Sequence, residues 1–264
     1  MVTALIEIYR DQFLLFVLVL TRVSGLVMTA PIFGSRNIPL RVRAFLAVGL
    51  ALMITPLQWD AAPAMPRDMV NMLLLVAREA VLGLAVGLAV MILFTGLHLT
   101  GQLIGQMSGM SLADAFDPTF DTSVPVFSQL LDAVTLSIFI AVGGHRHVLA
   151  ALLDTFEARP PGTRDLPAGL FETVVGITSE SFTVGIRAGA PVVVALLLAM
   201  LILGLISRTL PQLNVLAVGF SLNSMIMMLV LAASLGSLAW VVQYHADEII
   251  VTIRDAIVLA PTPP

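Results

Sequence analysis

Long apolar runs alternate with short polar connections along the whole chain. A helix needs about 20 apolar residues to cross the hydrocarbon core of a bilayer. The second of the runs is short and could be half of a bent hairpin, whereas the last two are longer than one span needs. The pattern predicts an all-α integral membrane protein whose helices lie at about 12–33, 44–57, 69–97, 126–152, 171–207 and 212–243.

Each of four connections contains proline, which ends helices and restricts the preceding residue. No shift in composition marks a second domain, so residues 1–264 are expected to form one helical domain with residues 244–264 as a C-terminal tail. Arginines in the first connection favour a cytoplasmic position for it, but those in the fourth give no consistent alternation, so the topology stays open. The connections are GSRNIPLRVR (34–43), QWDAAPAMPRD (58–68), DAFDPTFDTSVP (114–125) and EARPPGTRDLPAG (157–169).

Composition supports the membrane class. The chain is 58% hydrophobic and 11% charged with a mean hydropathy of +1.01, whereas soluble domains carry about 25% charged residues. A net charge of −4 argues against a nucleic-acid partner. There is no cysteine and no nucleotide-binding or hydrolase motif, and His145 and His147 do not share a helix face. The chain is therefore not expected to be an enzyme or to bind a metal or cofactor.

Several charges nevertheless lie inside or beside the apolar runs, where each costs about 2.5–3.5 kcal/mol at the bilayer centre. They imply partners, a wet cavity, or helices that are not in lipid. At 100° per residue, three of them form one polar stripe on the fifth helix. The stripe is either a solvated helix start with an internal salt bridge between Glu180 and Arg187, or a buried face toward a pore or another subunit. The charges are Arg22, Arg78, Glu79 and Asp132, with Glu172, Glu180 and Arg187 making the stripe.

Small residues recur at steps of four in GQLIGQMSGMSLA, where Gly101, Gly105 and Gly109 give one helix face without side chains. This spacing lets membrane helices approach closely. Packing within one chain and contact with another subunit are equally compatible with it.

The stretch LISRTLPQLNVLAVGFSLN (205–223) interrupts the most apolar part of the chain. Pro211 removes a backbone donor and frees a carbonyl one turn back, so in a membrane the break must lie in protein or line a cavity. Arg208, Gln212 and Asn214 could satisfy the freed groups. The stretch is interpreted as a structured hairpin tip that takes part in assembly, and the alternative is a polar loop at the membrane surface.

Four stretches together resemble, in this order, the signature regions of the FliR family of type III secretion export-gate proteins. The resemblance covers residues from about 10 to 245. The stretches are TRVSGLVMTAPIFGSRNIPLRVR (21–43), IGQMSGMSLADAFDP (104–118), GGHRHVLAALLDTFEARPPG (143–162) and LISRTLPQLNVLAVGF (205–220).

The resemblance implies long, bent helical hairpins packed into a hetero-oligomeric export gate. The partners it implies are the gate subunits FliP and FliQ and the switch protein FlhB, with unfolded flagellar proteins as passengers. It places the chain in the bacterial inner membrane, at the centre of the flagellar basal body.

The resemblance also implies a loop that plugs the closed pore, at about 106–126. The residues there supply soft apolar bulk, and methionine adapts to irregular gaps. An ordinary acidic loop is the alternative, and Met107 departs from the glutamine usual in the family. The candidate plug residues are Met107, Met110, Leu112, Phe116, Asp117, Pro118 and Phe120.

Two other functions stay open. An injectisome export-gate subunit shares the fold, but VGFSLN (218–223) lacks the Pro-Lys-Ser found in those relatives. A secondary transporter should show an inverted repeat with paired broken helices, and no matching half is evident.

Overall fold

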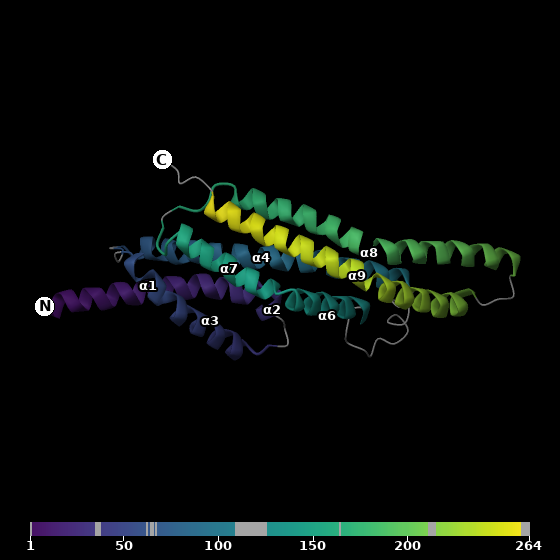
Figure 1. Cartoon of the computed structure of the whole chain (residues 1–264), viewed down its shortest axis with the longest axis horizontal. Helices are drawn as coiled ribbons and strands as arrows, with labels where there is room; N and C mark the ends of the chain where they lie inside the picture. The colour runs from purple at the N-terminus through teal and green to yellow at the C-terminus, as the bar shows by residue number, and fades with distance from the viewer. Residues whose placement is uncertain are drawn as a thin grey trace. The chain divides into compact units, whose positions relative to one another are not determined.

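The structure is a computed structural model that describes residues 2–34, 38–61, 63, 66, 68–108, 126–163, 165–210 and 215–259 (Figure 1). Its secondary structure over these residues is helical, without strands, which confirms the all-α prediction. The elements are α1 (Val2–Thr29), α2 (Pro31–Gly34), α3 (Leu40–Ile54), the 3₁₀ helix η1 (Thr55–Ala61), α4 (Met69–Met107), α6 (Val126–Ala141), α7 (Gly144–Ala158), α8 (Leu170–Thr209) and α9 (Val215–Val258).

Five helices in the described residues are long and apolar enough to cross a membrane, or six if α6 and α7 together form one span. The protein is thus an all-α, multi-pass membrane protein. Helix α8 has 40 residues, which at about 1.5 Å per residue is about twice the thickness of the hydrocarbon core. The candidate spans are Tyr9–Thr29, Leu40–Ala61, Met69–Met107, Leu170–Thr209 and Val218–Val258.

The chain divides into two compact units. Unit 1 comprises Met1–Ile92, Gly143–Thr178 and Ala246–Pro264, and unit 2 comprises Leu93–Val142 and Ser179–His245. The long helices α4, α8 and α9 each contribute one part to each unit.

The core of unit 1 is built on α1 and α4, and α3 packs beside α1 (Figure 1). Leu14 and Leu18 of α1 pack on Leu75 of α4. Further along, the two backbones touch: a Cβ added at Gly25 would lie 2.8 Å from the amide nitrogen of Leu84. Only glycine allows this approach, so the helix crossing is encoded by a missing side chain.

The core of unit 2 consists of two clusters that join α4 to other helices. Glycine again permits close contact, because a Cβ at Gly185 of α8 would overlap the carbonyl of Gly96 in α4. One cluster contains Leu97, Leu131, Leu238 and Val242, and the other contains Ile104, Val192, Leu196 and Met227.

Several helix boundaries differ from those that hydropathy predicts, and α1 begins at Val2 rather than at residue 12. Helix α4 continues from residue 97 to Met107, because Thr100 donates to the carbonyl of Gly96 and other polar side chains there have partners. The run 126–152 is divided after α6, since Gly143 has a φ of +86°, a left-handed conformation that favours glycine. Helix α9 continues to Val258, so most of the expected tail is helical.

The C-terminal part of α9 is amphipathic rather than continuously apolar, which explains why hydropathy ended it early. Its buried residues recur at helical spacing and face the core of unit 1, while most of the residues between them are polar. They are Ala246, Ile249, Ile250, Ile253 and Ile257.

Candidate functional site

A charged side chain lies at the centre of unit 1. Arg22, in the middle of α1, is 0% exposed. Its Nε donates to Oε2 of Glu79 in α4 at 2.6 Å. Its two other nitrogens donate to the backbone carbonyls of Thr155 and Arg159, each at 3.0 Å. The ring of Phe156 lies 4.3 Å from the guanidinium carbon. The cation is thus held by α1, α4 and the end of α7.

Two further groups extend this network to the C-terminal helix. The other carboxylate oxygen of Glu79 accepts the backbone N–H of Gly162 at 3.0 Å. Arg159 donates from Nε to the carbonyl of Ile257 at 2.7 Å and from a terminal nitrogen to that of Asp165 at 3.2 Å. Ile257 is in the last turn of α9, where carbonyls lack partners within the helix. Arg159 therefore caps α9 from the side.

The chemistry of this network is structural. Glu79 is 1% exposed, so neither member of the ion pair is open to a substrate. Removing two charges from water costs several kcal/mol, which their attraction offsets only when the remaining hydrogen bonds are also made. Here they are made by the backbone groups of Thr155, Arg159 and Gly162, at and just after the end of α7. We name the set Arg22, Glu79, Thr155, Arg159 and Gly162 the arginine network.

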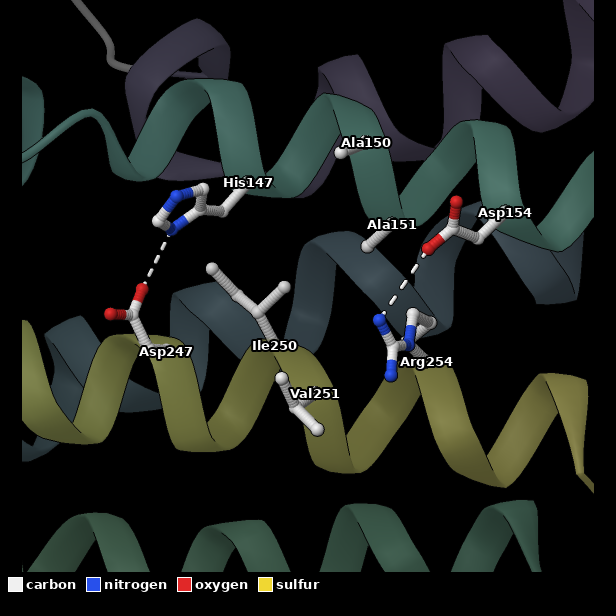
Figure 2. Close-up of a pocket in the computed structure, with 8 residues that line it drawn as sticks. All are labelled: His147, Ala150, Ala151, Asp154, Asp247, Ile250, Val251 and Arg254. Carbon is white, nitrogen blue, oxygen red and sulfur yellow. Dashed lines mark hydrogen bonds and ion pairs between the residues drawn. The ribbon is translucent and has the colours of Figure 1, made fainter.

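A groove of about 250 Å³ lies between α7 and α9 within unit 1 (Figure 2). His147 Nδ1 of α7 lies 2.7 Å from Asp247 Oδ1 of α9, and Arg254 of α9 lies 3.6 Å from Asp154 of α7. Arg254 also pairs with its neighbour Asp255 at 2.8 Å. Small side chains of α7 and aliphatic side chains of α9 form the floor between the two pairs. These exposed pairs connect the helices but are open to water.

Two polar groups lie between helices of unit 2. His98 of α4 has its Nδ1 2.7 Å from Asp132 of α6 and its Nε2 3.1 Å from the amide nitrogen of Gln102. An amide nitrogen only donates, so in this arrangement His98 accepts at Nε2 and donates to the carboxylate. Glu180 of α8 lies 3.3 Å from Nδ1 of His245 in α9. Both contacts join a helix to its neighbour.

Large apolar side chains cover the outer faces of α8 and α9 in unit 2. In the most apolar window of each helix, only 28% (α8) and 17% (α9) of the residues are buried, against 61% for α4. Between Arg187 and Asp247, Arg208 is the only Arg, Lys, Asp or Glu. These faces form a candidate surface for lipid or for other subunits. Its exposed members include Leu197, Leu198, Leu201, Ile202, Leu205, Met225, Met228 and Leu229.

Most of the candidate plug lies outside the described residues. Met107 ends α4 and packs against the cluster of Ile104 and Val192. The other plug residues, Met110, Leu112, Phe116, Asp117, Pro118 and Phe120, are not described. In the candidate hairpin tip, Arg208 is exposed in the last turn of α8, whereas Pro211, Gln212 and Asn214 lie outside the described residues.

The polar stripe is not buried within the chain. Glu172 and Arg187 are exposed on α8 and Glu180 is half-buried, because the stripe lies largely on the outer side of the helix. The partner beside Glu180 is His245 rather than Arg187, which one interpretation had paired with it.

The glycine face is partly inside unit 2. A Cβ at Gly101 would lie 2.9 Å from the Cα of Ser128 in α6, which favours packing within one chain at that position. Gly105 is also buried, and Gly109 lies outside the described residues.

Sequence reasoning identified Arg22 and Glu79 as charges in need of partners, but it did not pair them. It missed Thr155, Arg159 and Gly162 as members of the same network. Two of the stretches that carry the family resemblance could have indicated this pairing. Stretch 21–43 contains Arg22, and stretch 143–162 contains Thr155, Arg159 and Gly162. The arginine network thus joins two of the four stretches that carry the family resemblance.

Comparison with known proteins gives a consistent result. The model of the family described as "Bacterial export proteins, family 1" matches residues 13–249. The flagellar biosynthetic protein FliR of Escherichia coli K12 is 31% identical over 243 residues, 90% of each chain. Those of Bacillus subtilis and Aquifex aeolicus are 29% and 26% identical and align with 94% and 92% of this chain, and with 96% and 93% of their own lengths. The chain therefore belongs to the FliR family of bacterial export proteins.

Proposed function

We propose that this protein is a subunit of the flagellar type III export gate, where it helps to form and close the channel through which unfolded flagellar proteins are secreted. The observation that carries the proposal is the match over nearly the whole chain to flagellar FliR proteins. The relatives described above are flagellar, which favours this role over the injectisome alternative. The role is one of assembly rather than catalysis.

The outer faces of α8 and α9 support a role in assembly. A lone chain buries few of their apolar side chains, and a single arginine interrupts them. Lipid and apolar subunit surfaces are the two environments that such faces tolerate. The proposed partners are FliP, FliQ and FlhB, in the inner membrane at the flagellar basal body.

The proposed plug is the segment 106–126, which begins in the last turn of α4. Met107 is packed on the core of unit 2, so the segment would leave the helix from a fixed point. Replacing Met110 and Phe116 by Ala should make the assembled gate leak small ions. Conductance equal to that of the parent gate would remove the plug assignment.

The proposed hairpin tip between α8 and α9 is the second local element. Asn214→Leu should weaken assembly and swarming, because in this proposal the amide would supply hydrogen bonds that a broken backbone needs. Normal swarming would return the segment to the status of a surface loop.

Co-expression tests the function as a whole. The tagged chain is expressed with FliP and FliQ and purified in mild detergent, and the same gene is introduced into a flagellar strain that lacks its own fliR. We expect a stable complex and restored swarming. A chain that purifies alone and well folded in the presence of both partners would overturn the proposal.

A further inference from the structure

A second, larger groove lies in unit 1 between α4 and the start of α8. Its volume is about 560 Å³, within the range of about 300–1,000 Å³ typical of ligand sites. One wall is a stripe of α4 with residues at helical spacing. The other wall is the turn before α8 and the first turns of that helix. The α4 wall consists of Val81, Leu84, Ala85 and Leu88, and the opposite wall includes Leu166, Pro167, Leu170 and Val174.

The groove has a single charged lining residue. Glu172, in the first turn of α8, is exposed, and every other side chain that lines the groove is apolar. The turn that precedes it is fixed by Gly169, whose φ of +84° favours glycine. The site therefore combines an extended apolar surface with one carboxylate at a defined end.

The position of the groove on two candidate membrane spans and the chemistry of its lining indicate which kind of ligand it binds. Both α4 and α8 are candidate membrane spans by length and apolar composition, so a bilayer lipid is an occupant that an open apolar groove on these helices can meet. An acyl chain matches the apolar walls, and a carboxylate at one end is complementary to a cationic group on the same molecule. We propose that this groove binds a bilayer lipid with a primary amine in its headgroup, the acyl chain lying against α4 and the ammonium against Glu172.

The electrostatics of the groove discriminate between headgroups. An ammonium gains a charge-assisted hydrogen bond to the carboxylate, whereas an anionic headgroup is repelled by it. A zwitterionic lipid also carries a phosphate. That phosphate would meet the first turn of α8, where free N–H groups and the helix dipole favour negative charge. Glu172, part of the polar stripe, thereby acquires a role separate from subunit contact.

Native mass spectrometry of the full chain in mild detergent tests this assignment. The probes are dioleoyl phosphatidylethanolamine and dioleoyl phosphatidylglycerol, added separately at the same concentrations. We expect the parent chain to retain the ethanolamine lipid in preference. Glu172→Gln should reduce that retention about fivefold, the loss of a charge-assisted bond at an exposed site, and should leave the glycerol lipid unchanged or slightly increased.

Two further variants control the measurement. Glu157→Gln removes an exposed carboxylate on α7 that does not line the groove, and it should leave both lipids unchanged. Ala85→Leu adds bulk at the groove wall and should reduce retention of both lipids. Equal retention of the two lipids by the parent, or no effect of Glu172→Gln, would overturn the proposal.

The co-purification assay separates a lipid from a protein occupant. If Ala85→Leu abolishes the complex with FliP and FliQ but leaves lipid retention intact, the groove receives a protein segment and the lipid assignment is wrong. Failure of the lipid test leaves the export-gate assignment unaffected, because that assignment is tested by assembly and swarming.

Discussion

The arginine network of unit 1 and the outer faces of α8 and α9 in unit 2 differ in what they place in the wrong solvent. The first buries a charge, and the second exposes apolar side chains. In the first region, a full charge lies inside an apolar helix, where Arg22 pairs with the carboxylate of Glu79 and donates to the backbone carbonyls of Thr155 and Arg159. In the second, few charges are present and large apolar side chains point away from the core. The first region is satisfied within one chain, whereas the second needs lipid or another subunit.

The difference indicates which part of the protein depends on assembly. A buried ion pair contributes specificity when it is complete and becomes costly when one partner is removed. An exposed apolar face costs little in lipid but a great deal in water. Substitutions in unit 1 are thus expected to affect the stability of the lone chain. Substitutions on the outer faces are expected to affect insertion and complex formation.

Arg22→Met should have the largest effect. It leaves Glu79 charged and buried without its cation, a change that typically costs about 3–5 kcal/mol. We expect poor yield and a strongly lowered melting temperature of the lone chain in detergent, followed by tryptophan fluorescence.

The matched control is the double variant Arg22→Met/Glu79→Leu, which removes both charges. It should recover part of the lost stability, because no uncompensated charge is left. If Arg22→Met has the same melting temperature as the parent, the unpaired carboxylate of Glu79 costs no stability. The claim that unit 1 depends on a complete arginine network would then be wrong.

Leu201→Asp should have the next largest effect, but in a different assay. Leu201 is 63% exposed on α8, and an acid near the bilayer centre costs about 2.5–3.5 kcal/mol. We expect loss of membrane insertion or of co-purification with FliP and FliQ, whereas Leu201→Met should behave as the parent. Full assembly with aspartate would show that this face meets water.

Arg159→Met should have an intermediate effect on the lone chain. The loss leaves the carbonyls of Ile257 and Asp165 without their donor. Of the two residues only Ile257 is buried, and a buried group left unsatisfied costs about 1–3 kcal/mol. Hydrogen exchange should show faster opening of the last turns of α9, while the first turns of α7 keep their protection. Uniform protection in both segments would mean that Arg159 does not hold the end of α9.

Part of this architecture follows from the sequence. Apolar runs of membrane-spanning length predict helices because the bilayer leaves few other backbone structures possible. Their ends are harder to predict. Helix α4 passes the polar residues His98 and Gln102 because they bond to each other and to Asp132, a tertiary fact that hydropathy does not contain.

The arginine network shows the same limit. Arg22 and Glu79 could be recognised as charges in apolar runs, since each needs a partner in such surroundings. They are 57 residues apart, and no helical spacing relates them. The amphipathic period of Ile249, Ile253 and Ile257 was readable, but it was obscured by the lower hydropathy of the polar residues between them.

Asp154→Asn should have the smallest effect of the four substitutions on the stability of the lone chain. Asp154 lies on the groove between α7 and α9, 3.6 Å from Arg254 (Figure 2). Arg254 keeps its second partner, Asp255, at 2.8 Å. Exposed ion pairs contribute about 0–1 kcal/mol, so the melting temperature of the lone chain should change little and should respond weakly to salt. A loss as large as that of Arg159→Met would place this groove in a low-dielectric environment, because only there does a 3.6 Å pair approach the strength of the arginine network. The exposed face of α7 would then resemble the outer faces of α8 and α9, as a surface that is covered by lipid or by another subunit.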